Sequence, residues 1–322
     1  MVEENYVIEM INVTKAFGNF KANDNINLKV KKGEIHALLG ENGAGKSTLM
    51  NILSGLLQPT SGMLKVNGNE EVIASPTVAD KLGIGMVHQH FMLVKDFTVT
   101  ENIILGKETT KLGVLNKKDA AKTIKDLSDK YKLYVDPSAK VEDISVGMEQ
   151  RIEILKTLYR GADILIFEET TAVLTPQEIE ELMSIMKGLA AEGKSIILIT
   201  HKLDEIKQVA DRVTVIRKGK SIDTVDVKGT TKQQMADMMV GRSVIFKTDK
   251  IAPNPQEAVL EVTDLYVKES RGLEAVRGLN LTVRAGEVVG IAGIDGNGQS
   301  ELIQAITGLR KIESGTVKLN GE

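Results

Sequence analysis

The chain has 322 residues, more than one average domain needs and enough for two hydrophobic cores. Apolar residues make up 42% and charged residues 26% of it, as in an ordinary globular protein, and the formal net charge of −3 argues against a general nucleic-acid-binding protein. The absence of cysteine excludes disulfides and thiolate metal sites and favours a reducing compartment. The N-terminus is acidic and no apolar run approaches ~18 residues, so we expect neither a signal peptide nor a membrane-spanning segment.

Strand and helix signals alternate from the start of the chain. Ile35–Leu39 is a short apolar run that predicts a buried strand ending at Gly40, and apolar residues at helical spacing follow it. Residues 98–160 have a mostly helical pattern, so we expect a helical insert there. Its apolar stripe consists of Ala120, Ile124, Leu127 and Tyr131.

Two further buried strands and a well-marked helix come next. Asp163–Phe167 and Ser195–Thr200 are apolar runs of strand length. Between them, Thr175–Glu178 is a capping box with proline at the first helical position, and Gly193 ends the helix. This alternation predicts an α/β fold with a mainly parallel sheet.

The chain also contains an internal repeat with a constant offset of 253 positions, as between Gly45 and Gly298. We therefore expect one whole domain at 1–245, a semi-rigid linker at 246–256 that contains Pro253 and Pro255, and the opening part of a second, similar domain at 257–322. The matching pairs are Gly33-Glu34 with Gly286-Glu287, Gly43 with Gly296, Gly45 with Gly298, Ser47 with Ser300, Ser61-Gly62 with Ser314-Gly315, and Asn67-Gly68 with Asn320-Gly321.

A glycine-rich loop follows the first strand. Residues 40–47, GENGAGKS, fit the pattern G-x-x-x-x-G-K-[ST], in which backbone N–H groups surround phosphate oxygens at the start of a helix. Lys46 would reach the β- and γ-phosphates of a nucleotide and Ser47 would ligate Mg²⁺. The residues expected to contact the nucleotide here are Gly40, Glu41, Asn42, Gly43, Ala44, Gly45, Lys46, Ser47 and Thr48.

Polar side chains end the other buried strands. Glu168 and Glu169 follow one strand, where one carboxylate would hold the Mg²⁺ shell and the other would polarise an attacking water. His201 follows the next strand and could contact the γ-phosphate or orient that water. The amide of Gln89 could ligate Mg²⁺ or water. His88 and His90 have no carboxylate or third ligand nearby in the sequence, so we do not expect them to form a metal site.

Residues 116–119, NKKD, match a guanine-reading pattern that should end a buried strand. Here the pattern opens a helix, so we interpret Asn116 as its cap and Asp119 as a first-turn acid.

Over nearly all of residues 6–322, the chain resembles the ATP-binding cassette (ABC) ATPases. Residues 40–48 look like the family's first phosphate loop, Gln89 like its glutamine loop, and residues 144–151, ISVGMEQR, like its signature. Residues 164–169 are similar to the second nucleotide motif and His201 to the switch histidine.

The resemblance implies a P-loop NTPase core with an antiparallel β subdomain and a helical insert, binding ATP and Mg²⁺. It implies that Phe17 stacks on adenine and that Ser145 and Gly147 contact the γ-phosphate of ATP held by a facing cassette. The catalytic residues would be Lys46, Glu169 and His201, and the metal ligands Ser47, Gln89 and Glu168.

The tandem layout, the signature and residues 171–176, TAVLTP, look like importer ATPases for simple sugars and nucleosides. Residues 88–92 and 292–299 look closest to the nucleoside branch. This implies a peripheral protein at the cytoplasmic face of the cell membrane, with two membrane permease subunits, an extracytoplasmic substrate-binding protein as an indirect partner, a cassette–cassette contact and no nucleic acid. The alternatives are a simple-sugar importer ATPase, a soluble tandem-cassette ATPase and a regulator that binds nucleotide without hydrolysis.

The chain departs from the family's pattern at four positions. Glu168 stands in place of Asp, Thr170 in place of Pro, and Thr175 in place of Asp. In the second copy, Gln299 replaces the phosphate-loop lysine, which makes that loop degenerate. Losing one such electrostatic contact typically costs ~10²–10³ in rate, so we expect two unequal sites.

Overall fold

The computed structural model describes residues 5–88, 91–108, 110–111, 114–171, 174–243, 252–269, 272–293 and 296–322. The chain forms two compact units, Met1–Val244 and Ile245–Glu322, and each is described by itself. In the described ranges, no helix has both the length and the apolar character needed to cross a bilayer.

The first unit is built on a mixed sheet whose order is β12-β11-β3-β10-β9-β6. All of its adjacent pairs are parallel except β11 with β12, so the predicted α/β fold with a mainly parallel sheet is confirmed. Its strands are β3 (Ile35–Leu39), β6 (Ile84–Val87), β9 (Ile164–Glu168), β10 (Ser195–Thr200), β11 (Arg212–Arg217) and β12 (Lys220–Asp226). Every residue of β3 and β10 is buried, which explains why these strands are mostly apolar, with His36, Ser195 and Thr200 as their polar residues.

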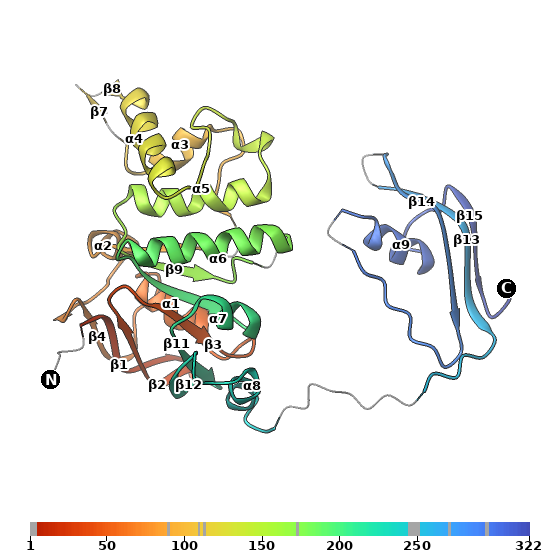
Figure 1. The fold of residues 1–322 in the computed structure, drawn as a ribbon, viewed down its shortest axis with the longest axis horizontal. Helices are drawn as coiled ribbons and strands as arrows, with labels where there is room; N and C mark the ends of the chain where they lie inside the picture. The colour runs from red at the N-terminus through yellow and green to blue at the C-terminus, as the bar shows by residue number, and fades with distance from the viewer. Residues whose placement is uncertain are drawn as a thin grey trace. The chain divides into compact units, whose positions relative to one another are not determined.

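An antiparallel sheet of order β2-β1-β4-β5 packs beside this core, as the family resemblance implied (Figure 1). Its strands are β1 (Tyr6–Phe17), β2 (Phe20–Lys31), β4 (Ser61–Val66) and β5 (Asn69–Glu70). Helix α1 (Lys46–Leu53) contributes Leu49, Met50, Ile52 and Leu53 to a buried cluster shared with both sheets. The short helix α2 (Pro76–Lys81) leads into β6.

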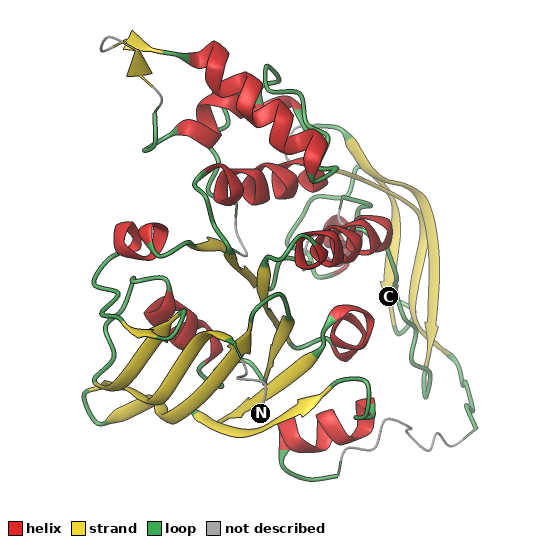
Figure 2. Ribbon diagram, turned by 60° about the vertical axis from the view of Figure 1, so that its left-hand side comes forward, coloured by secondary structure: helices red, strands yellow, loops and turns green. Residues whose placement is uncertain are grey.

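The insert predicted at about 98–160 is mostly helical (Figure 2). It comprises α3 (Val99–Ile104), β7 (Thr110–Lys111), β8 (Val114–Leu115), α4 (Lys117–Lys130), the 3₁₀ turn η1 (Val141–Asp143) and α5 (Val146–Tyr159). Asn116 caps α4 by accepting from the Asp119 N–H, as its interpretation as a helix cap requires.

Helix α6 (Pro176–Ala191) begins with the predicted capping box. The Glu178 carboxylate accepts from the Thr175 N–H at 2.9 Å, while the Glu178 N–H points back to the threonine hydroxyl. Leu182, Met183, Met186 and Leu189 form its buried face. Helices α7 (Leu203–Val209) and α8 (Lys232–Val240) cover β3 and β11 with a third, smaller cluster.

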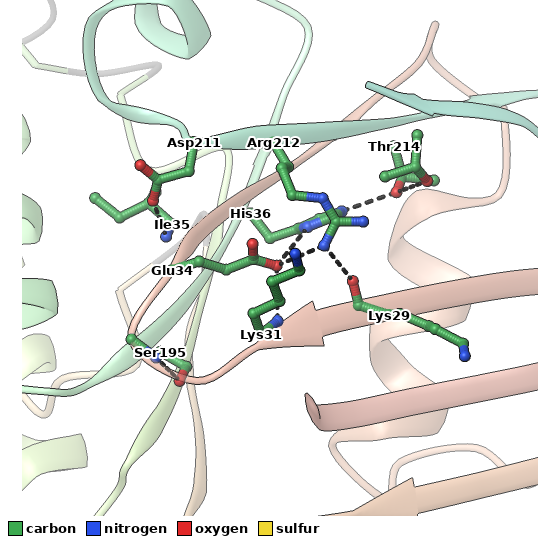
Figure 3. Close-up of polar contacts among 11 residues, drawn as sticks. Lys29, Lys31, Glu34, Ile35, His36, Ser195, Asp211, Arg212 and Thr214 are labelled. Carbon is green, nitrogen blue, oxygen red and sulfur yellow. Dashed lines mark hydrogen bonds and ion pairs between the residues drawn. The ribbon is translucent and has the colours of Figure 1, made fainter. Parts of the chain in front are cut away.

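A polar network closes the edge of the sheet where β3 and β11 begin (Figure 3). The fully buried His36 bonds Glu34 through Nδ1 at 2.9 Å and Thr214 through Nε2 at 2.8 Å. Burial is the largest influence on the pKa of Glu34 and would raise it. Hydrogen bonds from His36 and Lys31 and the charge of Arg212 nevertheless bring that pKa below its ordinary value.

The second unit repeats the opening of the first. It contains β13 (Ala258–Lys268), β14 (Glu274–Arg284), α9 (Gln299–Ile306) and β15 (Ser314–Leu319), with sheet order β14-β13-β15. Arg284 N–H donates to Glu287 as Lys31 N–H does to Glu34, at the offset of the repeat. Residues 288–293, which correspond to β3 and Gly40, form no strand, and Val288 is 98% exposed.

Candidate nucleotide site

The glycine-rich loop joins the end of the buried strand β3 to helix α1. Gly45 is the N-cap of α1 with φ 102°, and the cap position has no side-chain hydrogen bond. The first N–H groups of the helix are therefore available to an anion, and the positive end of the helix dipole points the same way. The loop has the connection, strand before and helix after, that the sequence pattern requires.

Glycine is required at position 45 for a second reason. A Cβ there would overlap the Ala22 carbonyl oxygen and lie 2.7 Å from Nδ2 of Asn23. Asn23 in turn donates to the Gly45 carbonyl at 3.0 Å, so β2 fixes the loop from behind. Gly43 has φ 79°, and a Cβ there would meet open space, so that part of the loop faces the cleft.

Lys46 is 5% exposed, and its ammonium donates to the Gly40 and Glu41 carbonyls at 2.7 and 2.9 Å. Burial lowers the pKa of Lys46, and the nearby carboxylates of Glu169 and Glu168 oppose that shift. The cation therefore lies inside the loop, with two carboxylates close enough to influence it.

Glu168 ends β9, which β10 separates from β3 in the sheet, and it lines the same cleft as the glycine-rich loop. The imidazole of His88 is the largest cause of its lowered pKa, burial opposes the shift, and the Ser47 hydroxyl and the charge of Lys46 act in the same direction as His88. His88 Nδ1 lies 3.8 Å from Glu168 Oε2, the separation of an ion pair, and is too far for a hydrogen bond. The expectation that no carboxylate lies near His88 is thus wrong, because β6 and β9 pair in parallel and bring the two strand ends together.

Glu169 and His201 form a pair at the ends of β9 and β10. The His201 Nδ1 atom lies 3.3 Å from Glu169 Oε1. Glu169 has φ 42°, in the left-handed region that costs a non-glycine residue about 1–3 kcal/mol. Its N–H donates to the Ile199 carbonyl at 3.0 Å, which ties it to β10.

The glycine-rich loop, Glu168 and Glu169 line one cleft of about 500 Å³, a volume within the range of ligand pockets, and His201 is not among the residues that line it. The predicted site residues that line it are Asn42, Gly43, Gly45, Lys46, Ser47, Thr48, Glu168 and Glu169. Phe20 and Ala22 also line it and were not predicted. Phe17 is the strand partner of Phe20 at the β1–β2 turn and is half exposed, with the Lys15 ammonium 5.2 Å from its ring centre. The sequence signal for Phe20 was available, since it is an aromatic residue that directly follows the Gly18-Asn19 turn.

Ser145 and Gly147 lie at the start of α5 and are not among the residues that line this cleft. The Ser145 hydroxyl caps α5 by accepting from the Met148 N–H. A Cβ at Gly147 would overlap the Glu178 carboxylate, so glycine permits the starts of α5 and α6 to approach closely. Their predicted contact with a nucleotide on a facing cassette stays a prediction.

Gln89 and His90 lie outside the described residues. In those that are described, no group of three or more His, Cys, Asp and Glu side chains could hold a metal ion by itself. Ser47 and Glu168 nevertheless present hard oxygen donors side by side, the kind that Mg²⁺ uses together with phosphate and water. That donor set fits the ion.

In the second unit, the degenerate loop keeps part of this arrangement. Gly298 caps α9 with φ 89°, as Gly45 caps α1. The Gln299 amide lies against Gly293, where Lys46 bonds Gly40 in the first unit. The described loop residues therefore follow the first copy, with a neutral amide where the cation stood.

A family model described as ABC transporter matches residues 23–172 and 276–322. The chain belongs to the ABC transporter family. The model matches both copies of the repeat, and each match includes the phosphate-loop positions, although the second copy has the neutral loop.

Two proteins named for import are similar over nearly the whole chain. Nucleoside import ATP-binding protein NupA of Lactococcus lactis is 67% identical over 98% of this chain, and guanosine import ATP-binding protein NupO of Bacillus subtilis is 65% identical over 98%. The chain spans 62% of the length of each. A solved ATP-binding cassette of an ABC transporter, MJ1267 in its ADP conformation, aligns with a TM-score of 0.65 at 23% identity, covering 74% of this chain and 99% of that one, which supports the fold.

Proposed function

We propose that this chain binds ATP with Mg²⁺ in the cleft at residues 40–48 and hydrolyses it to drive import of a nucleoside. The observation that carries the proposal is the cleft itself, where a buried lysine and a helix N-terminus lie opposite two carboxylates. The lysine and the helix N-terminus suit binding of a triphosphate, and the two carboxylates suit activation of water.

Each side chain then has a distinct role. The loop N–H groups and Lys46 hold the phosphates, and the lysine exchanges its two carbonyl bonds for phosphate oxygens. Glu169 accepts a proton from the attacking water, while His201, 3.3 Å away, orients the water or contacts the γ-phosphate. Mg²⁺ held by Ser47, Glu168 and Gln89 would neutralise phosphate charge.

The substrate class is proposed from the relatives. Two proteins that are 67% and 65% identical to the chain are named for nucleoside and guanosine import, and this favours a nucleoside over a simple sugar. Phe17 would stack on adenine, and Ser145 and Gly147 would contact the γ-phosphate of ATP held by a facing cassette. The site at 40–48 would then be the competent one of two, completed by another cassette's signature.

The partners proposed are two membrane permease subunits, with the chain peripheral at the cytoplasmic face and an extracytoplasmic binding protein as an indirect partner. A groove of about 200 Å³, lined in part by Leu56, Met86 and Met92, would receive a permease helix. His88 also lines this groove and lies 3.8 Å from Glu168, so a helix that binds there could shift His88 and through it Glu168, the proposed metal ligand.

Lys46→Ala tests the phosphate site. We expect it to weaken binding of ATP·Mg²⁺ by ~10²-fold or more, because a charge-assisted contact in a buried site is lost. Lys207→Ala is the matched control, since the Lys207 ammonium also donates to two carbonyls but lies on α7, among residues that do not line the cleft. Equal binding by both variants in calorimetry would refute the assignment of the loop.

Two further measurements separate the alternatives. Phosphate release by the chain distinguishes an ATPase from a regulator that binds without turnover. Competition between nucleosides and ribose for uptake, in vesicles that contain the full-length protein and its permeases, distinguishes the nucleoside importer from a sugar importer. Capture of ribosomes in place of permeases would favour the soluble tandem-cassette alternative.

A further inference from the structure

We propose that Glu205 is a positioning residue that holds together the two segments carrying Glu169 and His201. The inference rests on the proposed ATP hydrolysis, for which it names a residue that touches neither nucleotide nor water. We call Glu205, Thr171 and Thr200 the Glu205 clasp.

The clasp joins the ends of two adjacent strands. Glu205 Oε1 accepts from the Thr171 hydroxyl at 2.6 Å, and Oε2 accepts from the Thr200 hydroxyl at 2.8 Å. Thr171 follows Glu169 by two residues, and Thr200 directly precedes His201. One carboxylate therefore fixes the separation of the two short segments that carry the predicted water-activating pair.

The members of the clasp are buried and satisfied by one another. Thr171, Thr200 and Glu205 are each at most 5% exposed. Lys202 completes the hydrogen bonding, because its ammonium donates to the Thr171 hydroxyl at 3.0 Å and its N–H donates to the Thr200 hydroxyl at 3.0 Å. Each threonine hydroxyl thus accepts from Lys202 and donates to Glu205, which gives the arrangement one defined geometry.

The clasp lies beside the strained backbone at Glu169 and helps to hold it. A glutamate with φ 42° adopts that conformation only where the surrounding structure enforces it. The Glu169 N–H is held by the Ile199 carbonyl, and two residues later Thr171 is held by Glu205. These two attachments fix the turn on both sides of its strained residue.

A role in stabilising helix α7 would be the simpler explanation for an acidic residue in its first turn. Asp204 already provides a charge in that turn, with 84% of its side chain exposed. Both carboxylate oxygens of Glu205 accept from threonine hydroxyls outside the helix, and Oε1 also lies 3.2 Å from the ammonium of Lys202, the N-cap residue of α7, which itself donates to Thr171. The geometry therefore favours positioning of the strand ends over support of the helix.

The test compares Glu205→Gln, Thr171→Val and Thr171→Ser with Thr214→Val. In Glu205→Gln, the amide nitrogen cannot accept from the threonine hydroxyl that it faces, so one of the two hydroxyl-to-carboxylate hydrogen bonds is lost. We expect kcat for ATP hydrolysis to fall by ~10-fold or more in Glu205→Gln and Thr171→Val, because small misplacements of reacting groups have such effects, while KM changes by less than ~2-fold. Thr171→Ser keeps the hydroxyl and should retain the rate.

Thr214→Val is the matched control for lost stability. Thr214 is also a fully buried threonine, on β11, which β3 separates from β10 in the sheet, and its hydroxyl bonds His36 and Thr224. The inference is wrong if kcat falls no further in Glu205→Gln and Thr171→Val than in Thr214→Val. It is also wrong if these variants raise KM and leave kcat unchanged.

A second readout needs no turnover. The chain has four histidines, so the imidazole resonances can be assigned by replacing each in turn. In nucleotide-free protein, Glu205→Gln should move the His201 imidazole signal toward the position it takes in Glu169→Gln, and Thr214→Val should leave it in place. An unmoved signal overturns the clasp, whereas absence of phosphate release from the unaltered chain overturns only the proposed hydrolysis.

Discussion

Replacing Thr170 with valine removes a buried hydroxyl while keeping the size and branching of the side chain. Thr170 is 2% exposed, and its Oγ1 atom has no hydrogen-bond partner among the described residues. An unsatisfied buried polar group costs about 1–3 kcal/mol, so Thr170→Val should raise the free energy of unfolding by about 1 kcal/mol. In a unit of this size, that corresponds to a rise in Tm of about 2–4 °C.

The neighbouring residue provides an internal comparison. Thr171 is 3% exposed, but its hydroxyl donates to the Glu205 carboxylate. Thr171→Val should therefore lower the free energy of unfolding by about 1.5–3 kcal/mol, because a hydrogen bond to a charged group is lost. The same chemical change at adjacent buried positions is thus expected to have opposite signs.

Urea unfolding followed by circular dichroism measures both variants against the unaltered chain. The m-values should agree, so that the midpoints report stability directly. The reasoning is refuted if Thr170→Val destabilises the first unit, or if both variants shift the midpoint in the same direction.

Two other predictions concern the loop and the insert. Gly45→Ala should abolish ATP binding and destabilise the unit by more than ~3 kcal/mol, because the new Cβ overlaps the Ala22 carbonyl. Gly43→Ala should destabilise it by only about 1 kcal/mol, because its Cβ meets open space and only the positive φ is unfavourable. Nucleotide titration and urea unfolding of the two variants check this, and similar losses in both would contradict it. Lys117 and the Thr98 hydrogen bonds lower the pKa of Glu101 from 4.5 to about 2, so the ionised carboxylate stabilises the fold above pH ~4.5 and that stabilisation is lost as the pH falls toward 2. The difference in unfolding free energy between the unaltered chain and Glu101→Gln, about 1 kcal/mol or less for this solvent-exposed ion pair, should shrink between pH 5 and pH 3. A difference that stays constant with pH would exclude the charge as its source.

Local sequence signals predicted the parts of this fold that depend on neighbours along the chain. The loop at 40–47, the all-buried strand β3 and the capping box at Thr175–Glu178 each rest on a few consecutive residues, and the structure contains them. The sheet could be expected to be parallel because strands and helices alternate.

Contacts between distant segments could not be predicted in this way. The approach of His88 to Glu168 depends on which strand β9 selects as its neighbour, and no periodicity specifies that choice. The Glu205 clasp likewise joins residues 34 positions apart through hydroxyls that look unremarkable in the sequence. The repeat predicted a second loop before a helix, and Gly298 is the N-cap of α9 as Gly45 is of α1. The repeat could not show that the segment before that loop forms no strand, because strand formation depends on pairing partners.

The central place of β3 has a consequence for the order in which the first unit folds. Its neighbours are β10 and β11, which begin at residues 195 and 212, so the strand that carries the phosphate loop gains its partners only after most of the unit has been synthesised. Such long-range parallel pairing is slow, and until it occurs an apolar strand with free edges can pair with other chains. Residues 288–293 are similarly apolar in the second unit, and all of them except the partly buried Val289 are exposed. Conditions that delay chain elongation past residue 217 should therefore favour aggregation through residues 35–39.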